Sequence, residues 1–102
     1  MDVVIIEDEK LVSEDLSDIL RDLDHDINIT GVIRSVKEAV AYFKKGVTPH
    51  LIFSDIQLGD GYSFEIFHEL DHPAPVIYCT AFNQHALQAF ETNGIAYVLK
   101  PY

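Results

Sequence analysis

Five polar side chains of the sequence stand where short apolar runs end, and their types are those that chemistry on phosphoryl groups requires. They are Glu7, Asp8, Asp55, Thr80 and Lys100. Carboxylates can act as nucleophiles and as ligands of hard cations, a hydroxyl donates a hydrogen bond, and an ammonium group supplies a fixed positive charge. Their combined chemistry depends on whether the fold brings them together.

Three carboxylates within a few ångströms of one another are unfavourable, because two unit charges about 4 Å apart repel by roughly 4 kcal/mol at an effective dielectric of about 20. Either one of them is protonated or a cation lies among them. Oxygen ligands with positions left for water and phosphate suit Mg²⁺ better than Zn²⁺, which favours His and Cys. Asp55 is then the nucleophile that forms an acyl phosphate, with Lys100 and Thr80 directed at the incoming phosphoryl oxygens.

The apolar runs themselves predict the elements that position these groups. Short β-branched runs of this kind are typical of strands buried on both faces, and we expect strands at 3–6, 27–33, 51–53, 76–79 and 95–99. Apolar stripes at helical spacing span 12–23, 36–43, 64–70 and 86–90. This alternation predicts an α/β fold with one parallel sheet. Ligands bind such sheets at the carboxyl ends of the strands, where the five polar groups stand.

Two local patterns refine the helix boundaries. Ser35 and Glu38 have the spacing of a capping box, in which each side chain accepts a hydrogen bond from the other residue's backbone N–H. The turn at 59–61, Gly-Asp-Gly, is expected to lead into the third helix.

Length and charge limit the possible functions. The chain has 102 residues, about one small domain, and a formal net charge of -10. Ten of the 17 carboxylates fall within residues 1–26, so the domain should repel nucleic acid and anionic membranes. Cys79 is the single cysteine and most simply an inert core residue. With no disulfide framework, signal peptide or membrane span in the sequence, a cytoplasmic location is expected.

Three sequence tracts carry a resemblance to a known family. These are 55–64 (DIQLGDGYSF), 80–82 (TAF) and 97–101 (YVLKP). They resemble the receiver domains of two-component response regulators, and most closely those whose output is a LytTR-type DNA-binding domain. The resemblance spans the whole chain. It implies a flavodoxin-like, doubly wound parallel sheet with strand order 2-1-3-4-5.

The resemblance also implies a role for each acidic residue. Asp55 would accept a phosphoryl group from a phosphohistidine on a sensor histidine kinase. Glu7, Asp8 and Asp55 would hold Mg²⁺, with the backbone carbonyl of Gln57 as a further ligand. Glu7 stands where many family members have Asp, which keeps the charge but adds a methylene group. The loop after Asp55 is shorter than in the commoner receiver pattern.

The remaining site residues would form the switch. Lys100 would pair with Asp55 and then with the phosphoryl oxygens, Thr80 would move to hydrogen-bond the phosphoryl group, and Tyr97 would follow it inward. The added charge, about two negative units, would change the surface of the fourth helix and the fifth strand. Taken singly, Thr80 could be an ordinary strand-end hydroxyl and Tyr97 a half-buried core residue.

The family comparison also suggests where the domain is incomplete. Receiver domains close with a fifth helix after the Lys-Pro pair, and this sequence ends at Tyr102. We therefore expect a receiver domain over 1–102 that is truncated after the fifth strand, with the fifth helix and the output domain missing. DNA would be contacted only through that output domain. The uncovered apolar side chains, each worth about 1.5 to 3 kcal/mol when buried, favour association into a homodimer.

Four alternatives accompany this interpretation. The acids 7–9 alone could be a solvated helix start. The chain could be an interaction module with a vestigial site, although all five polar positions hold competent residues. A phosphatase of the haloacid dehalogenase type needs a second aspartate where Gln57 stands. The tract 68–72 (HELDH) matches the H-E-x-x-H zinc protease motif, but Pro73 follows at once and only His85 remains as a third histidine ligand.

Overall fold

The computed structural model describes residues 1–69, 74–80 and 94–99, with the backbone alone for 68, 69, 80 and 94–99. Its centre is a five-stranded sheet in which all paired strands run parallel. The strands are β1 (Asp2–Ile6), β2 (Asn28–Ile33), β3 (Leu51–Ser54), β6 (Val76–Thr80) and β7 (Gly94–Leu99). The spatial order is β2-β1-β3-β6-β7. This confirms the predicted order 2-1-3-4-5, because β6 and β7 are the fourth and fifth strands of this sheet.

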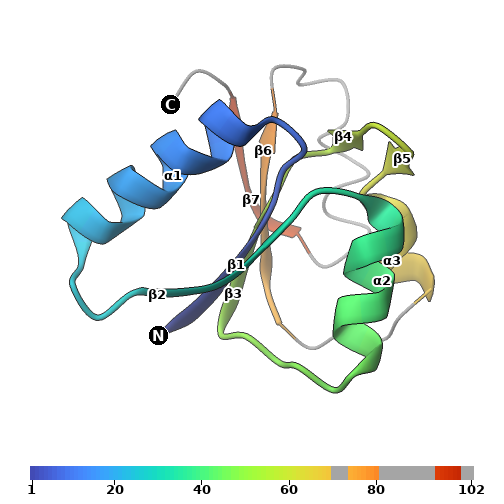
Figure 1. Ribbon diagram of the computed structural model, residues 1–102, viewed down its shortest axis with the longest axis horizontal. Coiled ribbons are helices and arrows are strands. Elements are labelled where there is room, and N and C mark those ends of the chain that lie inside the picture. The colour runs from blue at the N-terminus through green and yellow to red at the C-terminus, as the bar shows by residue number, and fades with distance from the viewer. Residues whose placement is uncertain (70–73, 81–93, 100–102) are drawn as a thin grey trace.

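Helices cover both faces of the sheet. Helix α1 (Lys10–Leu23) lies on one side, and α2 (Val36–Lys44) and α3 (Phe64–Glu69) lie on the other (Figure 1). Side chains of β1 alternate between the faces, as the two-residue period of a strand requires. Val4 and Ile6 join the larger core cluster beneath α2 and α3, whereas Val3 and Ile5 pack against Leu16 of α1. Burial on both faces explains the continuous apolar run at the start of the sequence.

Aromatic side chains fix α3 against the sheet. Tyr78 of β6 is fully buried, and its ring meets Phe64 edge-on with 5.2 Å between the ring centroids. Phe67 contacts the same tyrosine ring at 6.4 Å. Such pairs contribute about 0.5 to 1.5 kcal/mol each beyond the burial of their surface. They hold the start of α3 close to the segment that follows Asp55.

The face that carries α1 is less completely covered. Leu51, Phe53 and Ile77 are only half-buried, and on α1 itself Ile19 and Leu23 are 39% and 75% exposed. The larger cluster on the opposite face is buried far more completely. Apolar surface therefore remains accessible on the α1 side of the part of the sheet that the structure describes.

The segment after β3 contains a hairpin that the sequence did not predict. Strands β4 (Gln57–Leu58) and β5 (Gly61–Tyr62) pair antiparallel, so Gly59 and Asp60 form a two-residue hairpin turn before α3 begins. The turn does lead into the third helix, as expected, and α3 begins at Phe64, two residues after β5 ends. Gly61 has a φ of +148°, a conformation that side-chain-bearing residues rarely adopt.

The predicted capping box is half right. The Ser35 hydroxyl accepts a 3.0 Å hydrogen bond from the Glu38 N–H, as expected. The Glu38 carboxylate, however, accepts a 3.1 Å hydrogen bond from Arg34 N–H and not from Ser35. The Glu38 side chain therefore reaches the backbone of the residue that precedes Ser35. The predicted fourth helix (86–90) and Leu70 lie outside the described residues. No helix within the described ranges is long and apolar enough to cross a membrane.

Candidate phosphorylation and metal site

The loop that leaves β1 places a buried acid at the carboxyl edge of the sheet. Glu7 N–H donates a 2.8 Å hydrogen bond to the Ile33 carbonyl, which extends the pairing of β1 with β2 by one residue. The Glu7 side chain is only 2% exposed, and its carboxylate accepts a 3.2 Å hydrogen bond from Glu9 N–H. Glu7 is therefore not part of a solvated helix start. A carboxylate at such a position needs hydrogen bonds or a cation to offset its lost hydration.

Backbone hydrogen bonds on both sides fix Asp55. Its N–H donates to the Ile6 carbonyl at 2.8 Å, which continues the pairing of β3 with β1. Its carboxylate oxygen Oδ1 accepts a 2.8 Å hydrogen bond from Ile56 N–H, and its carbonyl accepts one of 2.9 Å from the Ser54 hydroxyl. The side chain is half-buried. Asp55 thus has a defined orientation while its carboxylate remains reachable from solvent.

The three acids meet at this edge. Carboxylate oxygens from Glu7, Asp8 and Asp55 all lie within 4.8 Å of one another. At that separation each pair of ionised groups repels by roughly 3 to 4 kcal/mol at an effective dielectric of about 20. Glu7 is buried, Asp55 half-buried and Asp8 exposed, so the cluster is closed on one side and open on the other. An oxygen-only ligand set with an open side fits Mg²⁺ and leaves room for a phosphoryl donor.

The β4–β5 hairpin borders the same cluster. A Cβ atom placed on Gly59 would lie 3.9 Å from the Oδ2 atom of Asp8, so the turn lies beside that carboxylate. Gln57 begins the hairpin and its side chain is exposed. Its predicted role as a ligand through the backbone carbonyl stays a prediction.

The switch residues are described in part. Thr80 ends β6 and pairs with Leu99 at the same carboxyl edge of the sheet, and Tyr97 pairs with Tyr78 in the middle of β7. Their side chains, together with Lys100, lie outside the described residues. The roles assigned to these three residues remain predictions. Of the H-E-x-x-H motif, His68 and Glu69 end α3, and the rest of the motif and His85 are also outside the described part.

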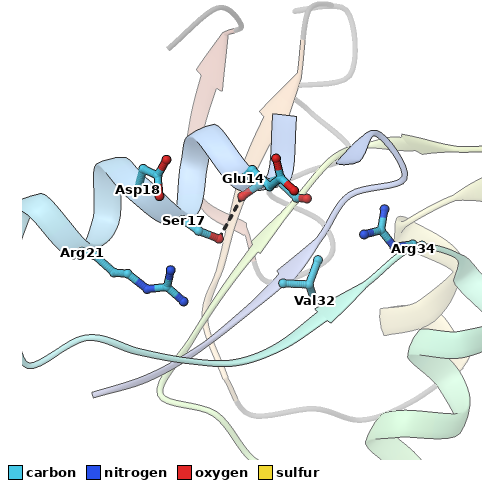
Figure 2. Close-up of a pocket in the computed structure, with 7 residues that line it drawn as sticks. Glu14, Ser17, Asp18, Arg21, Val32 and Arg34 are labelled. Atoms are coloured by element: carbon cyan, nitrogen blue, oxygen red, sulfur yellow. Dashed lines mark hydrogen bonds between the residues drawn. The ribbon is translucent and has the colours of Figure 1, made fainter. Parts of the chain in front are cut away.

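A separate pocket of about 250 Å³ lies between α1 and the edge strand β2 (Figure 2). It is lined by Ser13, Glu14, Ser17, Asp18, Arg21, Val32 and Arg34. The hydrogen bond drawn there runs from the Ser17 hydroxyl to the Ser13 carbonyl, at 2.8 Å. Both arginines of the chain, Arg21 and Arg34, border this pocket. It shares no residue with the acidic cluster, so it is distinct from the candidate phosphorylation site.

Sequence reasoning gave Asp60 no role beyond the turn, yet its carboxylate contacts α2. It accepts hydrogen bonds from the backbone N–H groups of Val36 and Lys37, at 2.8 and 3.1 Å. These hydrogen bonds lower the pKa of Asp60 below its ordinary value of 3.8. The contact joins residues 24 and 23 positions apart, so no local pattern could reveal it. The only sequence feature that could have pointed to this contact was an acid in a Gly-Asp-Gly turn.

Comparison with known proteins decides the family. Residues 3–102 match the response regulator receiver domain. The chain belongs to this family. As a receiver domain it is 34% identical over 103 residues to the sensory transduction protein LytT of Bacillus anthracis, covering 98% of this chain and 41% of that protein. It is 37% identical over 101 residues to the transcriptional regulatory protein BtsR of Salmonella typhi, covering 97% and 41%.

A solved structure agrees with the sequence relatives. The response regulatory domain of protein mrkE from Klebsiella pneumoniae superimposes with a TM-score of 0.85 at 28% identity, covering all of this receiver domain and 84% of that chain. The expected resemblance to LytT-type regulators and the flavodoxin-like fold are thereby confirmed. The receiver domain spans about 41% of the length of the two curated relatives named above.

Proposed function

We propose that Asp55 is the phosphoacceptor of this receiver domain and that phosphorylation depends on Mg²⁺. The observation that supports this most directly is the meeting of three carboxylates at the carboxyl edge of the sheet, all within 4.8 Å. Hydrogen bonds to Ile6 and from Ile56 orient Asp55 among them. Glu7, Asp8, Asp55 and the Gln57 carbonyl would hold the cation. When bound, Mg²⁺ would neutralise negative charge on the carboxylates and on the phosphoryl oxygens.

The reaction is an in-line phosphoryl transfer. A carboxylate oxygen of Asp55 attacks the phosphorus of a phosphohistidine on a sensor histidine kinase. The new O–P bond forms as the P–N bond breaks, and the imidazole nitrogen keeps the electron pair and takes up a proton. The hydrogen bond from Ile56 N–H to Oδ1 orients the Asp55 carboxylate for this attack. The domain would also assist the later hydrolysis of its own acyl phosphate.

Phosphorylation would then act as a switch. Lys100 and the Thr80 hydroxyl would contact the phosphoryl oxygens and Tyr97 would move inward. The new charge, about two negative units, would stabilise a second arrangement of the surface of the predicted fourth helix and β7. The domain would thus be a signalling phosphoprotein, and the formation and hydrolysis of its acyl phosphate would turn the switch on and off.

The domain that carries out the response would be a separate part of the proposed full-length protein. The relatives LytT and BtsR are named as a sensory transduction protein and a transcriptional regulatory protein, and we propose that a LytTR-type DNA-binding domain follows the receiver domain. A net charge of -10 makes the receiver domain itself a poor ligand for DNA. The expected partner is a sensor histidine kinase. The expected location is the cytoplasm, where the regulator would meet both the kinase and DNA.

The α1 side of the sheet supports a further proposal about the domain boundary. Phe53 and Ile77 are half-buried there, and we propose that a fifth helix covers them in the longer protein. The 102-residue chain would instead cover this face by forming a homodimer. Sedimentation velocity should show dimers that Ile77→Asp dissociates, with the exposed Val32→Asp of the β2 edge as control. A monomer at all concentrations would contradict this proposal.

Phosphorylation itself can be tested with a small donor. The protein is incubated with Mg²⁺ and acetyl phosphate, and its intact mass is measured. We expect the gain of one phosphoryl group, which depends on Mg²⁺ and is absent from Asp55→Asn. Asp26→Asn, a change of the same type away from the cluster, should respond like the wild type. If Asp55→Asn gains the same mass as the wild type, another residue is the acceptor, and if the wild type gains none, the site is vestigial.

A further inference from the structure

Asp60 caps the N-terminus of α2, although it lies in a distant part of the chain. The first backbone N–H groups of a helix have no partner within the helix. At α2, those of Val36 and Lys37 donate to the two carboxylate oxygens of Asp60, at 2.8 and 3.1 Å, and that of Glu38 donates to the Ser35 hydroxyl. One side chain from the β4–β5 hairpin thus satisfies two consecutive donors. The negative charge also lies at the favourable end of the helix dipole.

The same turn lies beside the acidic cluster on its other side. Asp60 and Gly59 are the two residues of the hairpin turn. A Cβ atom on Gly59 would lie 3.9 Å from the Oδ2 atom of Asp8. The hairpin begins with Gln57, two residues after Asp55. A single short segment therefore connects the phosphorylation site to the start of α2, and Figure 1 shows β4 and β5 running from the upper end of the sheet to a position above the start of α2.

The hairpin needs such an anchor. It consists of two paired positions, and a hairpin this short is not stable by itself. Leu58 is buried, and Ser63 N–H closes the segment with a 2.8 Å hydrogen bond to the Ile56 carbonyl. These contacts hold the base of the hairpin. The two hydrogen bonds of Asp60 hold its tip, and the depressed pKa of Asp60 agrees with a carboxylate that they stabilise in its ionised form.

We propose that Asp60 is a positioning residue for phosphorylation: by fastening the hairpin tip to the start of α2, it keeps the Gln57 backbone and Gly59 in place beside Asp8 and so preforms the metal site. The inference rests on the proposed function of the Asp55 site. Replacing Asp60 would release the tip of the hairpin from α2. Because Asp60 is itself outside the acidic cluster, the replacement would leave every cluster carboxylate intact. Second-layer residues of this kind tune how tightly a site binds its metal.

The test compares two losses of capping at the same helix end. Asp60→Ala removes the contact from the hairpin, whereas Ser35→Ala removes a cap that belongs to α2 alone. Mg²⁺ affinity is measured by titration calorimetry, and amide hydrogen exchange follows Leu58 and Gly61, whose pairing defines the hairpin. We expect both variants to lose stability. Only Asp60→Ala should weaken Mg²⁺ binding, by roughly tenfold, and speed exchange in the hairpin.

A conservative variant keeps the test decisive. Asp60→Asn retains one oxygen acceptor, so its Mg²⁺ affinity should fall between those of the wild type and Asp60→Ala. If Asp60→Ala does not fold, the comparison of Asp60→Asn with Ser35→Ala decides. Equal Mg²⁺ affinity and equal hairpin exchange in the Asp60 and Ser35 variants would overturn the proposal and leave Asp60 a helix cap only. Failure of Asp55 to become phosphorylated would instead refute the proposed function, because these readouts require no phosphoryl transfer.

Discussion

The backbone N–H of Asp55 donates a 2.8 Å hydrogen bond to the carbonyl oxygen of Ile6. Ile6 is the last residue of β1 and Glu7 follows it directly. The pairing of β3 with β1 therefore brings the proposed phosphoacceptor next to the buried acid of the cluster, although Glu7 and Asp55 are 48 positions apart in the chain. The proximity of these carboxylates therefore depends on the register between β1 and β3, and a shift of that register would separate them.

Glu7 should oppose folding when no cation is bound. Its carboxylate is 2% exposed and lies within 4.8 Å of two others. Glu7→Gln keeps the shape and the acceptor for Glu9 N–H while it removes the charge. Without Mg²⁺ we expect this variant to be more stable than the wild type by about 1 to 3 kcal/mol, and Mg²⁺ should stabilise it less. Urea unfolding with and without Mg²⁺ measures both effects.

The control for this prediction is Glu9→Gln. Glu9 is the neighbouring exposed acid and does not belong to the cluster. Its replacement should change neither the stability without Mg²⁺ nor the gain on adding Mg²⁺ by more than about 0.5 kcal/mol. If Glu7→Gln behaves in the same way as Glu9→Gln, the charge of Glu7 does not contribute to a metal site.

Gly61 should tolerate no side chain. Its φ is +148°, and an added Cβ atom would approach the Oε2 atom of Glu65 to 2.8 Å. Gly61→Ala is expected to lower the free energy of unfolding by about 1 to 3 kcal/mol. Glu65 is exposed and its carboxylate can move aside, so most of this loss is backbone strain and the double variant with Glu65→Ala should recover little of it. Thermal or urea unfolding measures this. A Gly61→Ala protein as stable as the wild type would show that the hairpin adopts another conformation.

The contribution of Asp60 to stability should depend on pH. Hydrogen bonds from the Val36 and Lys37 N–H groups lower the pKa of Asp60 below 3.8. A carboxyl whose pKa is lowered by folding stabilises the folded state above its unfolded pKa, and this contribution is lost as the pH falls through the folded value. The stability difference between the wild type and Asp60→Asn should therefore be greatest above about pH 5 and should shrink below about pH 3.

Urea midpoints measured across this pH range test the prediction. Ser35→Ala is the control, because it removes a cap at the same helix end that cannot titrate. Its loss of stability, about 1 kcal/mol, should be the same at every pH. A difference between the wild type and Asp60→Asn that stays constant as the pH falls would mean that the two hydrogen bonds do not depend on the charge of Asp60.

The parts of the fold that could be predicted from sequence are those set by local periodicity. The buried runs 3–6 and 51–53 predicted strands, and the general rule for parallel sheets then predicted that Glu7, Asp8 and Asp55 would meet. The β4–β5 hairpin was missed because strands of two residues leave no periodic signal. The contact of Asp60 with Val36 was missed because it depends on how two distant segments pack. The reach of Glu38 to Arg34 was missed because the motif does not distinguish neighbouring donors.

Asp55 is the residue proposed to carry the phosphoryl group. Borohydride reduces an aspartyl phosphate to homoserine, so peptide mass spectrometry after phosphorylation by acetyl phosphate and borohydride treatment locates the modified residue. We predict homoserine at position 55 alone, formed only when both Mg²⁺ and the donor are present. Homoserine at Asp8 or at any other aspartate, or none under conditions in which a known receiver domain is modified, would contradict the account.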